Sequence, residues 1–274
     1  MFKYEITNDK PFIVNGKYAF TVFPIPVNKS EAELLNKKMG TFFTRTVTEF
    51  DIKNETEWYY IIKDEEEILD NYKGSKRKQI VKGLSNCDVK KIDSDVIKKS
   101  GFGIFKKWNE GFRNSYSESD FFSQLEYDEK TNNIKIDYFG IYTKDGLLIG
   151  YAKNYIIDTL KKIAFYETIA YDPAFLEKNI NYAVTHEMNK YYLNELKYDF
   201  ITNGSRNLYH KTNIQDYLIS KFNYRKAYCV MDIIYRKDIK ILVNLLYPFR
   251  KFLKKIEKID SLLFQEEIRR SFLE

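Results

Sequence analysis

The chain of 274 residues has little cysteine, proline and glycine. Its two cysteines, Cys87 and Cys229, lie far apart and belong to no CxxC or Cys/His spacing, which argues against a metal site or a disulfide framework. We therefore expect two buried thiols in a reducing cytoplasm and no bound metal. With 5 prolines and 11 glycines, the sequence also argues against long flexible linkers and low-complexity regions.

Long apolar runs are missing as well. None approaches the roughly 20 residues that span a membrane, and the first six residues lack the apolar core of a signal peptide. The sequence therefore predicts a cytoplasmic protein. Residues 238–274 leave two interpretations open, because they combine apolar residues at helical spacing with several lysines and arginines, interrupted at Pro248. They form helices packed on their domain, or a basic amphipathic helix in peripheral contact with an anionic membrane at its inner face.

Aromatic residues are abundant, with 23 Tyr and 21 Phe, and the formal net charge is +6. The charge mildly favours an anionic partner. Lysines and an arginine gather between residues 73 and 107, beginning with the apparent helix Gly74–Gly83. They are the solvated surface of a helix and its loops, or a contact for phosphate or nucleic acid. The region lacks the interleaved aromatics of a base-stacking platform, which weakens the second interpretation.

The stretch from 138 to 236 has the clearest pattern of elements. Residues 134–142, 147–157 and 162–171 alternate as three antiparallel strands, with a turn at Asp145-Gly146. The third strand stops at Asp172-Pro173. A helix (180–196), a short buried strand (199–204), a helix opening near Asn213 (213–221) and a strand (228–235) follow.

The N-terminal part predicts a hairpin at Asn15-Gly16, strands within 41–63 and two helices. Ser30 and Glu33 form a capping pair for a helix that stops at Gly40. Residues 64–72 have acids in their first turn and predict a second helix. We divide the chain into an N-terminal extension (1–55), a core (56–237) and a C-terminal amphipathic helical extension (238–274).

Asp145–Gly150, the strand from Lys162, the helix from Ile180 and the segment 222–228 resemble, in their order, the GNAT acyltransferase fold. The basic helix and strand at 74–89 resemble the Fem-type branch, whose members build peptidoglycan bridges or carry related GNAT domains. The resemblance covers about residues 55–236. It implies an α/β (α+β) fold: a mixed, mostly antiparallel sheet with a central parallel strand pair and helices on both faces.

Two departures from the family pattern stand out. GNAT enzymes open their central helix with a glycine-containing loop that cradles the pyrophosphate of coenzyme A, but no glycine occurs here between Gly150 and Gly204. Many also have a tyrosine general acid ahead of a Gly-Phe pair, for which Asn223-Tyr224 stands here. Ile219 falls where that tyrosine is expected, and Tyr217 is expected to point elsewhere.

The resemblance implies that two parallel strands splay apart where the donor carbonyl binds, at 169–171 and 200–203. Backbone amides of Ile169, Ala170 and Tyr171 then hold the donor. The other residues that we assign to donor binding are Asn179, Asn181 and Asn213 at helix starts, and Ser205 and Arg206 are assigned to the acceptor.

For proton transfer, Glu167 is the first candidate for the general base, because a mid-strand carboxylate suits a cleft. It is otherwise a solvent-facing sheet residue. Tyr171 is a candidate acid or an aromatic wall, and His210 a candidate catalytic group or a loop hydrogen-bonding residue. His186 is expected on the surface.

Three functions remain open. The first is an N-acyltransferase that moves an acyl group, acetyl foremost, from acyl-CoA to an amine on a sugar, cell-envelope precursor or other small molecule. The second is Fem-type aminoacyl transfer from charged tRNA. The third is a non-enzymatic domain that keeps the fold without the donor site.

Overall fold

The computed structural model describes residues 3–7, 10–21, 26–110, 117–130, 135–158, 161–207 and 213–272. The chain forms two compact units, each assembled from segments far apart in sequence. Unit 1 comprises residues 1–61, 204–214 and 225–274, and unit 2 comprises residues 62–203 and 215–224. The three-part division of the chain given above stays a prediction.

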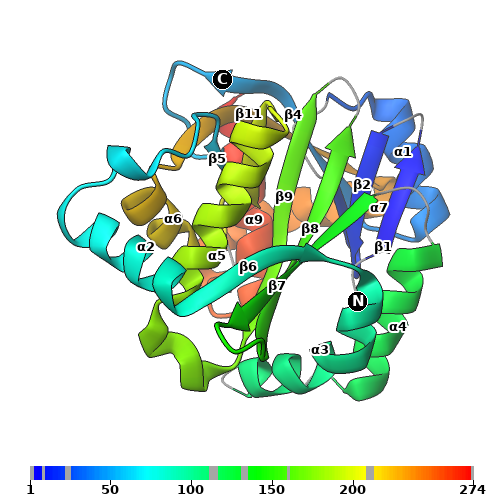
Figure 1. The fold of residues 1–274 in the computed structure, drawn as a ribbon. Helices are drawn as coiled ribbons and strands as arrows, with labels where there is room; N and C mark the ends of the chain where they lie inside the picture. The colour runs from blue at the N-terminus through cyan, green and yellow to red at the C-terminus, as the bar shows by residue number, and fades with distance from the viewer. Residues whose placement is uncertain are drawn as a thin grey trace. The chain divides into compact units, whose positions relative to one another are not determined.

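Unit 2 is built on strands in the order β10-β9-β8-β7-β6 (Figure 1). They are β6 (Cys87–Ile92), β7 (Lys135–Thr143), β8 (Leu148–Asp158), β9 (Lys162–Tyr171) and β10 (Phe200–Ser205), whose last two residues belong to unit 1. Neighbours from β6 to β9 are antiparallel, and β10 is parallel to β9. The predicted meander, its turn at Gly146 (φ +91°) and the parallel pair are confirmed.

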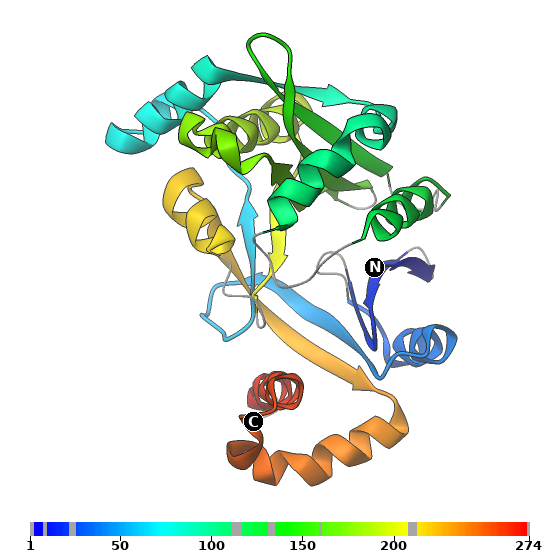
Figure 2. The ribbon, with the colours of Figure 1, turned by 90° about the horizontal axis from the view of Figure 1, so that it is seen from below.

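Helices cover both faces of this sheet, as predicted (Figures 1 and 2). On one face lie α2 (Gly74–Asn86) and α5 (Ile180–Asn189), which continues as a π-helical turn, Lys190–Glu195; on the other lie α3 (Ser94–Asn109) and α4 (Glu118–Lys130). Two successive residues of β7 mark the faces, because strand side chains alternate. Phe139 contacts the rings of Tyr191 and Tyr192, whereas Tyr138 packs with Ile97 of α3. The last helix of the unit is α6 (Ile214–Phe222).

In unit 1 the strand order is β1-β2-β3-β4-β11. The strands are β1 (Lys3–Thr7), β2 (Lys10–Asn15), β3 (Tyr18–Thr21), β4 (Phe43–Ile52) and β11 (Arg225–Tyr235). Only the β3–β4 pair among them is parallel. The Asn15-Gly16 hairpin is confirmed, with Gly16 at φ +59°. The strand β5 (Tyr59–Lys63) carries the chain from unit 1 into unit 2.

The helices of unit 1 are α1 (Lys29–Met39), α7 (Lys237–Leu246), α8 (Arg250–Leu253) and α9 (Glu257–Ser271). Leu35 of α1 packs with Phe12 and Ile234 in one apolar cluster. The next residue of β11, Tyr235, faces the other way and donates its hydroxyl to Glu266 of α9 at 3.0 Å. Pro248 lies in a 3-10 turn, Tyr247–Phe249, so the predicted break between the C-terminal helices is confirmed.

Two expectations about helices are wrong, and one helix was not expected. The capping box of α1 is Asn28 with Glu31, two residues before the predicted pair. Residues 64–72 form only a 3-10 turn, Leu69–Asn71, because the backbone N–H and C=O of Glu67 bond to the side chain of Asn194. The helix α3 was not predicted, since Gly101 and Gly103 lower its helix propensity.

Candidate functional site

The parallel strands β9 and β10 separate early. Their register joins Phe200–Thr202 to Ile163–Phe165 and ends there, while β9 stays paired with β8 as far as Tyr171. At the next position the side-chain amide of Asn203 donates to the carbonyl of Tyr166 at 3.3 Å, where a backbone amide would continue a ladder. In its second half, β9 is therefore still paired with β8 but no longer with β10.

A β-bulge lies at the point of separation. Lys153 of β8 pairs with Thr168 and Asn154 pairs with Tyr166, so Glu167 is the extra residue. A bulge bends its strand and increases the local twist, which turns β9 away from a parallel neighbour. Glu167 is half-buried and accepts a hydrogen bond from the hydroxyl of Thr168. The sequence singled out Glu167 as a candidate base, and the structure places it in the bulge.

The residues predicted to hold the donor follow the bulge directly. Ile169, Ala170 and Tyr171 form the end of β9, and Ala170 is fully buried in the cluster beneath α3 and α4. Tyr171 is half-buried, and burial raises the pKa of its phenol. Tyr171 therefore keeps its proton at neutral pH.

The start of α5 has an unusual backbone. Asn179 adopts φ +57° and ψ 34°, a left-handed conformation that glycine usually provides and asparagine tolerates. Its carbonyl accepts the amides of Tyr182 and Ala183, so the first amides of the helix, those of Ile180 and Asn181, point beyond its end. The first turn contains no acidic residue. An asparagine thus takes the place of a missing glycine at a helix end that favours anions.

Helix α2 fixes this end of α5 through a glycine. A Cβ atom at Gly83 would lie 2.5 Å from the carbonyl oxygen of Asn179 and 3.1 Å from the amide nitrogen of Ala183. Asn86 of α2 also donates to the carbonyl of Lys178 at 3.3 Å. The close approach of the two helices therefore depends on the missing side chain.

We expect Gly83→Ala to destabilise the protein by about 1–3 kcal/mol, because the added methyl group meets rigid backbone. Gly103→Ala on α3 is the matched control, since its Cβ would enter open space. That change should be neutral or stabilising by up to about 1 kcal/mol, as for alanine over glycine within a helix. Urea unfolding measures both, and equal stability of the two variants would contradict the packing role of Gly83.

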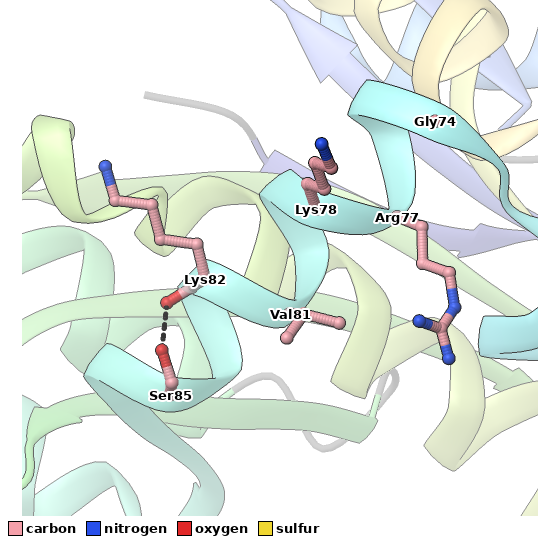
Figure 3. A pocket seen from close by; sticks show the side chains of 6 residues that line it. All are labelled: Gly74, Arg77, Lys78, Val81, Lys82 and Ser85. Carbon is pink, nitrogen blue, oxygen red and sulfur yellow. Dashed lines mark hydrogen bonds between the residues drawn. The ribbon is translucent and has the colours of Figure 1, made fainter.

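The outer face of α2 is basic and slightly hollowed. A hollow of about 470 Å³ is lined by Gly74, Arg77, Lys78, Val81, Lys82 and Ser85 (Figure 3). The charged ends of Arg77, Lys78 and Lys82 point in different directions, and Arg77 pairs with Asp70 at 3.0 Å. These charges are spread along the helix and do not converge on one point, which suits several separate phosphates better than a single small anion.

Tyr217 of α6 lies beside the first turn of α5. Its ring packs against the rings of Tyr182 and Phe222, with centroids 5.4 and 5.6 Å away. The hydroxyl is buried and finds no partner of good hydrogen-bond geometry among the described residues, although Thr185 lies beside it. Burial raises the pKa of Tyr217, and nearby Tyr171 contributes. The ring of Tyr217 therefore faces the first turn of α5 through Tyr182, and the expectation that it points away from the site stays a prediction.

A buried polar network contacts the second half of α5, at His186 and Asn189. The carboxylate of Glu67 contacts His186 Nδ1 at 2.7 Å, accepts the hydroxyl of Tyr72 at 2.8 Å and the amide of Asn189 at 3.1 Å, and lies 3.5 Å from Lys63 Nζ. His186 is 5% exposed, so its predicted surface position is wrong. A signal was present: α5 contains almost no charged residues on any side, which is typical of a helix buried all round.

This network reaches β9. The side-chain oxygen of Asn189 accepts hydrogen bonds from Tyr166 at 3.0 Å and Tyr224 at 2.9 Å. Tyr166 immediately precedes the bulge at Glu167. The network therefore ties α5 and the end of α6 to the point where β9 leaves β10.

The remaining predicted site residues lie in unit 1 or outside the residues that the structure describes. In unit 1, Arg206 Nη1 lies 2.5 Å from the carboxylate of Glu57, and the guanidinium stacks over Phe264. Ser205, also in unit 1, accepts a hydrogen bond from Arg45 at 3.4 Å. Asn213 is exposed just before α6, and His210 lies outside the described residues. The described residues contain no cluster of three or more His, Cys, Asp or Glu that could hold a metal ion.

No protein-family model and no curated protein matches the sequence. Solved structures do match. The crystal structure of FemX superposes with a TM-score of 0.56 at 10% identity, over 93% of this chain and 90% of that chain. L-PGS from Bacillus licheniformis gives 0.45 at 11% identity, over 86% and 84%. A tandem GNAT protein from the clavulanic acid biosynthesis pathway gives 0.44 at 8%, over 82% and 77%. The chain has the Fem-like form of the GNAT fold.

Proposed function

We propose that this chain is an N-acyltransferase in which an amine attacks an activated acyl group directly. The observation that supports it best is the separation of β9 from β10 at the Glu167 bulge. It leaves the amides of Ile169 and Tyr171 as donors for the acyl carbonyl, and such pre-positioned donors stabilise the oxyanion that forms during attack. The amide of Ala170, also expected to hold the donor, faces β8 instead, because Asp172 N–H donates to Ile149 of β8 and the amides of an antiparallel strand alternate between its edges. Ile169 and Tyr171 take this role.

The chemistry needs two proton transfers. The amine nitrogen attacks the carbonyl carbon, its proton passes to the carboxylate of Glu167, and the bond to the leaving group breaks. The leaving group then takes a proton from a tyrosine. Tyr171 and Tyr217 both carry the proton that this step needs, because burial raises their pKa, although the same shift makes each phenol a weaker acid toward the leaving group. No covalent enzyme intermediate is required.

The donor that fits the start of α5 is an acyl-CoA, and acetyl-CoA is the first to test. Its pyrophosphate would lie at the amides of Ile180 and Asn181, with Asn179 in the place of a glycine. The acceptor would be an amine on a sugar or cell-envelope precursor. These assignments rest on the backbone of α5 and on the fold shared with FemX.

Asn179→Asp tests this donor site. Aspartate keeps both the shape and the left-handed backbone, but its charge would repel a pyrophosphate, so we expect acetyl-CoA to bind at least about tenfold more weakly. Asn223→Asp is the matched control: Asn223 is exposed and has the same φ of +57° at the end of α6. Isothermal titration calorimetry measures both. No heat from the unchanged protein would remove acyl-CoA as the donor, and equal weakening in both variants would remove its pyrophosphate from the start of α5.

The basic face of α2 favours a second candidate, aminoacyl transfer from charged tRNA. Divergent Lys78, Lys82 and Arg77 suit the spaced phosphates of a polynucleotide. Binding of tRNA should then weaken steeply with salt, and Lys78→Glu/Lys82→Glu should reduce both the affinity and the salt slope. Tight acetyl-CoA binding without tRNA binding decides for the first candidate. Absence of both leaves a domain that keeps the fold without a donor site.

A further inference from the structure

The C-terminal helices of unit 1 expose a row of large apolar side chains. In α7, Ile241 is 63% exposed, Leu242 49% and Leu245 65%; in the turn and α8 that follow, Phe249 is 58% and Phe252 83% exposed, and Ile256 comes next at 50%. Elsewhere among the described residues such side chains are exposed singly. A contiguous patch of this kind marks a surface that another apolar phase covers.

The row is not the loose end of a helix, because the opposite side is held in place. Ile239 and Val243 of α7 are buried, so the helix already has an inner face. Arg270 of α9 donates to Asn244 at 2.9 Å and lies 3.9 Å from the ring centroid of Tyr247. Figure 2 shows α7 and α8 following β11, with α9 beside α8. The apolar row is therefore the outer face of an anchored segment.

Positive charge surrounds the row. The basic residues between 237 and 256 are Lys237, Lys240, Arg250, Lys251, Lys254 and Lys255. The acidic residue in this segment, Asp238, is already paired with Arg236 at 2.6 Å. Arg250 pairs with Glu267 of α9, whereas the lysines have no acidic partner among the side chains that the structure describes. Apolar side chains ringed by unpaired lysines match a bilayer surface with anionic headgroups.

A second copy of this chain fits the same surface less well. A two-fold interface would place the lysines of one copy against those of the other, and like charges facing each other oppose association. Anionic lipid offers opposite charge and an apolar interior together. No helix within the described residues is long and apolar enough to cross a membrane, so the contact would be made along one helix face.

We propose that residues 237–256 dock this protein on an anionic lipid bilayer, with Leu245, Phe249 and Phe252 entering the interface and Lys251, Lys254 and Lys255 contacting the headgroups. The inference is independent of the proposed transfer reaction. It concerns a surface of unit 1, whereas the β9 bulge and the α5 start belong to unit 2.

Flotation of the full chain with lipid vesicles tests the proposal. We expect the protein to float with vesicles of phosphatidylcholine and phosphatidylglycerol at low salt and not with phosphatidylcholine alone. Leu245→Ser/Phe249→Ser/Phe252→Ser and, separately, Lys251→Glu/Lys254→Glu/Lys255→Glu should each lower the floated fraction about tenfold or more. All of these side chains are exposed, so thermal melting should stay unchanged.

Matched controls alter the same residue types elsewhere. Leu34→Ser/Leu147→Ser/Leu176→Ser changes exposed leucines outside the patch, and Lys53→Glu/Lys99→Glu/Lys135→Glu changes exposed lysines outside it. Both should float like the unchanged protein. The proposal is overturned if the unchanged protein stays in the vesicle-free fractions, or if the control and patch variants lose flotation equally. It is also overturned if the only effect of the triple serine variant is to convert a dimer to a monomer, as measured by light scattering.

A fluorescence measurement gives a second, direct result. In Phe252→Trp, anionic vesicles should shift the tryptophan emission to shorter wavelength as the ring enters the interface. In Leu147→Trp, at an exposed turn of unit 2, they should not. Because the protein also contains two native tryptophans, each spectrum is compared with that of the unchanged protein. Equal shifts at both positions, or none at 252, would contradict docking through this segment.

Discussion

Glu67→Gln should destabilise the protein by about 3–5 kcal/mol, the loss expected when one partner of a buried ion pair is removed. The side chains of Glu67 and Lys63 are 0% and 3% exposed. Glutamine keeps the shape but leaves the Lys63 ammonium without a counter-charge among the described residues. It also turns an amide donor toward groups that now donate to the carboxylate, such as Tyr72, whose pKa burial and Glu67 both raise. Urea unfolding followed by circular dichroism measures the loss.

The neighbouring residue supplies the control. Glu66 pairs with Lys197 at 2.6 Å, but both side chains are more than half exposed, so Glu66→Gln should cost no more than about 1 kcal/mol. Lys63→Met/Glu67→Gln should recover part of the loss, because it removes the buried charge along with its partner. If Glu67→Gln were as mild as Glu66→Gln, the network would be a by-product of packing and would not hold α5 in place.

The sequence predicts the sheet of unit 2 well because the determining signals are local. Alternation and the Asp145-Gly146 turn define the meander, and Asp172-Pro173 marks the end of β9. The segment Ile169–Tyr171 could therefore be assigned to a strand end beside a helix start. The start of α5 was harder, because a glycine was expected where Asn179 supplies the left-handed turn.

Features that depend on pairing between distant residues could not be predicted. The bulge exists only in the register of β9 with β8, and a single strand sequence carries no register. The Glu67 network joins residues more than a hundred positions apart, so acids at 64–67 predicted a helix start where an exposed loop turns the side chain of Glu67 inward. The position of Tyr217 depends on how α6 packs against Tyr182, which the spacing from Asn223-Tyr224 does not define.

The placement of Glu167 combines both kinds of information. A carboxylate in the middle of a strand suggested a cleft, and the bulge gives a structural reason for it. Its carboxylate lies near Tyr138 and Tyr151 of the cluster beneath α3 and α4, because its charge helps burial to raise the pKa of both phenols. The edge of β9 freed from β10 adjoins it. A base beside this cluster and amide donors along the strand edge would act on an amine and an acyl carbonyl that meet at the bulge.

Glu167→Gln should therefore lower kcat for acyl transfer by about 10²–10⁴-fold, the usual contribution of a general base, while acetyl-CoA affinity stays unchanged. Release of free thiol, followed with an amine acceptor found by screening, measures the rate. Glu167→Asp should fall between, since it keeps a carboxylate on a shorter side chain. Glu66→Gln is again the control and should react like the unchanged protein.

A pH profile separates catalysis from a structural role for Glu167. If the carboxylate accepts the amine proton, the pH–rate profile of the unchanged protein has an acidic limb that Glu167→Gln lacks, and the residual rate of the variant follows the amine alone. A variant that merely distorts the bulge would instead keep the limb, bind acetyl-CoA more weakly and melt at a lower temperature. A full rate in Glu167→Gln would move the base to another residue, because direct attack at neutral pH still requires an acceptor for the amine proton.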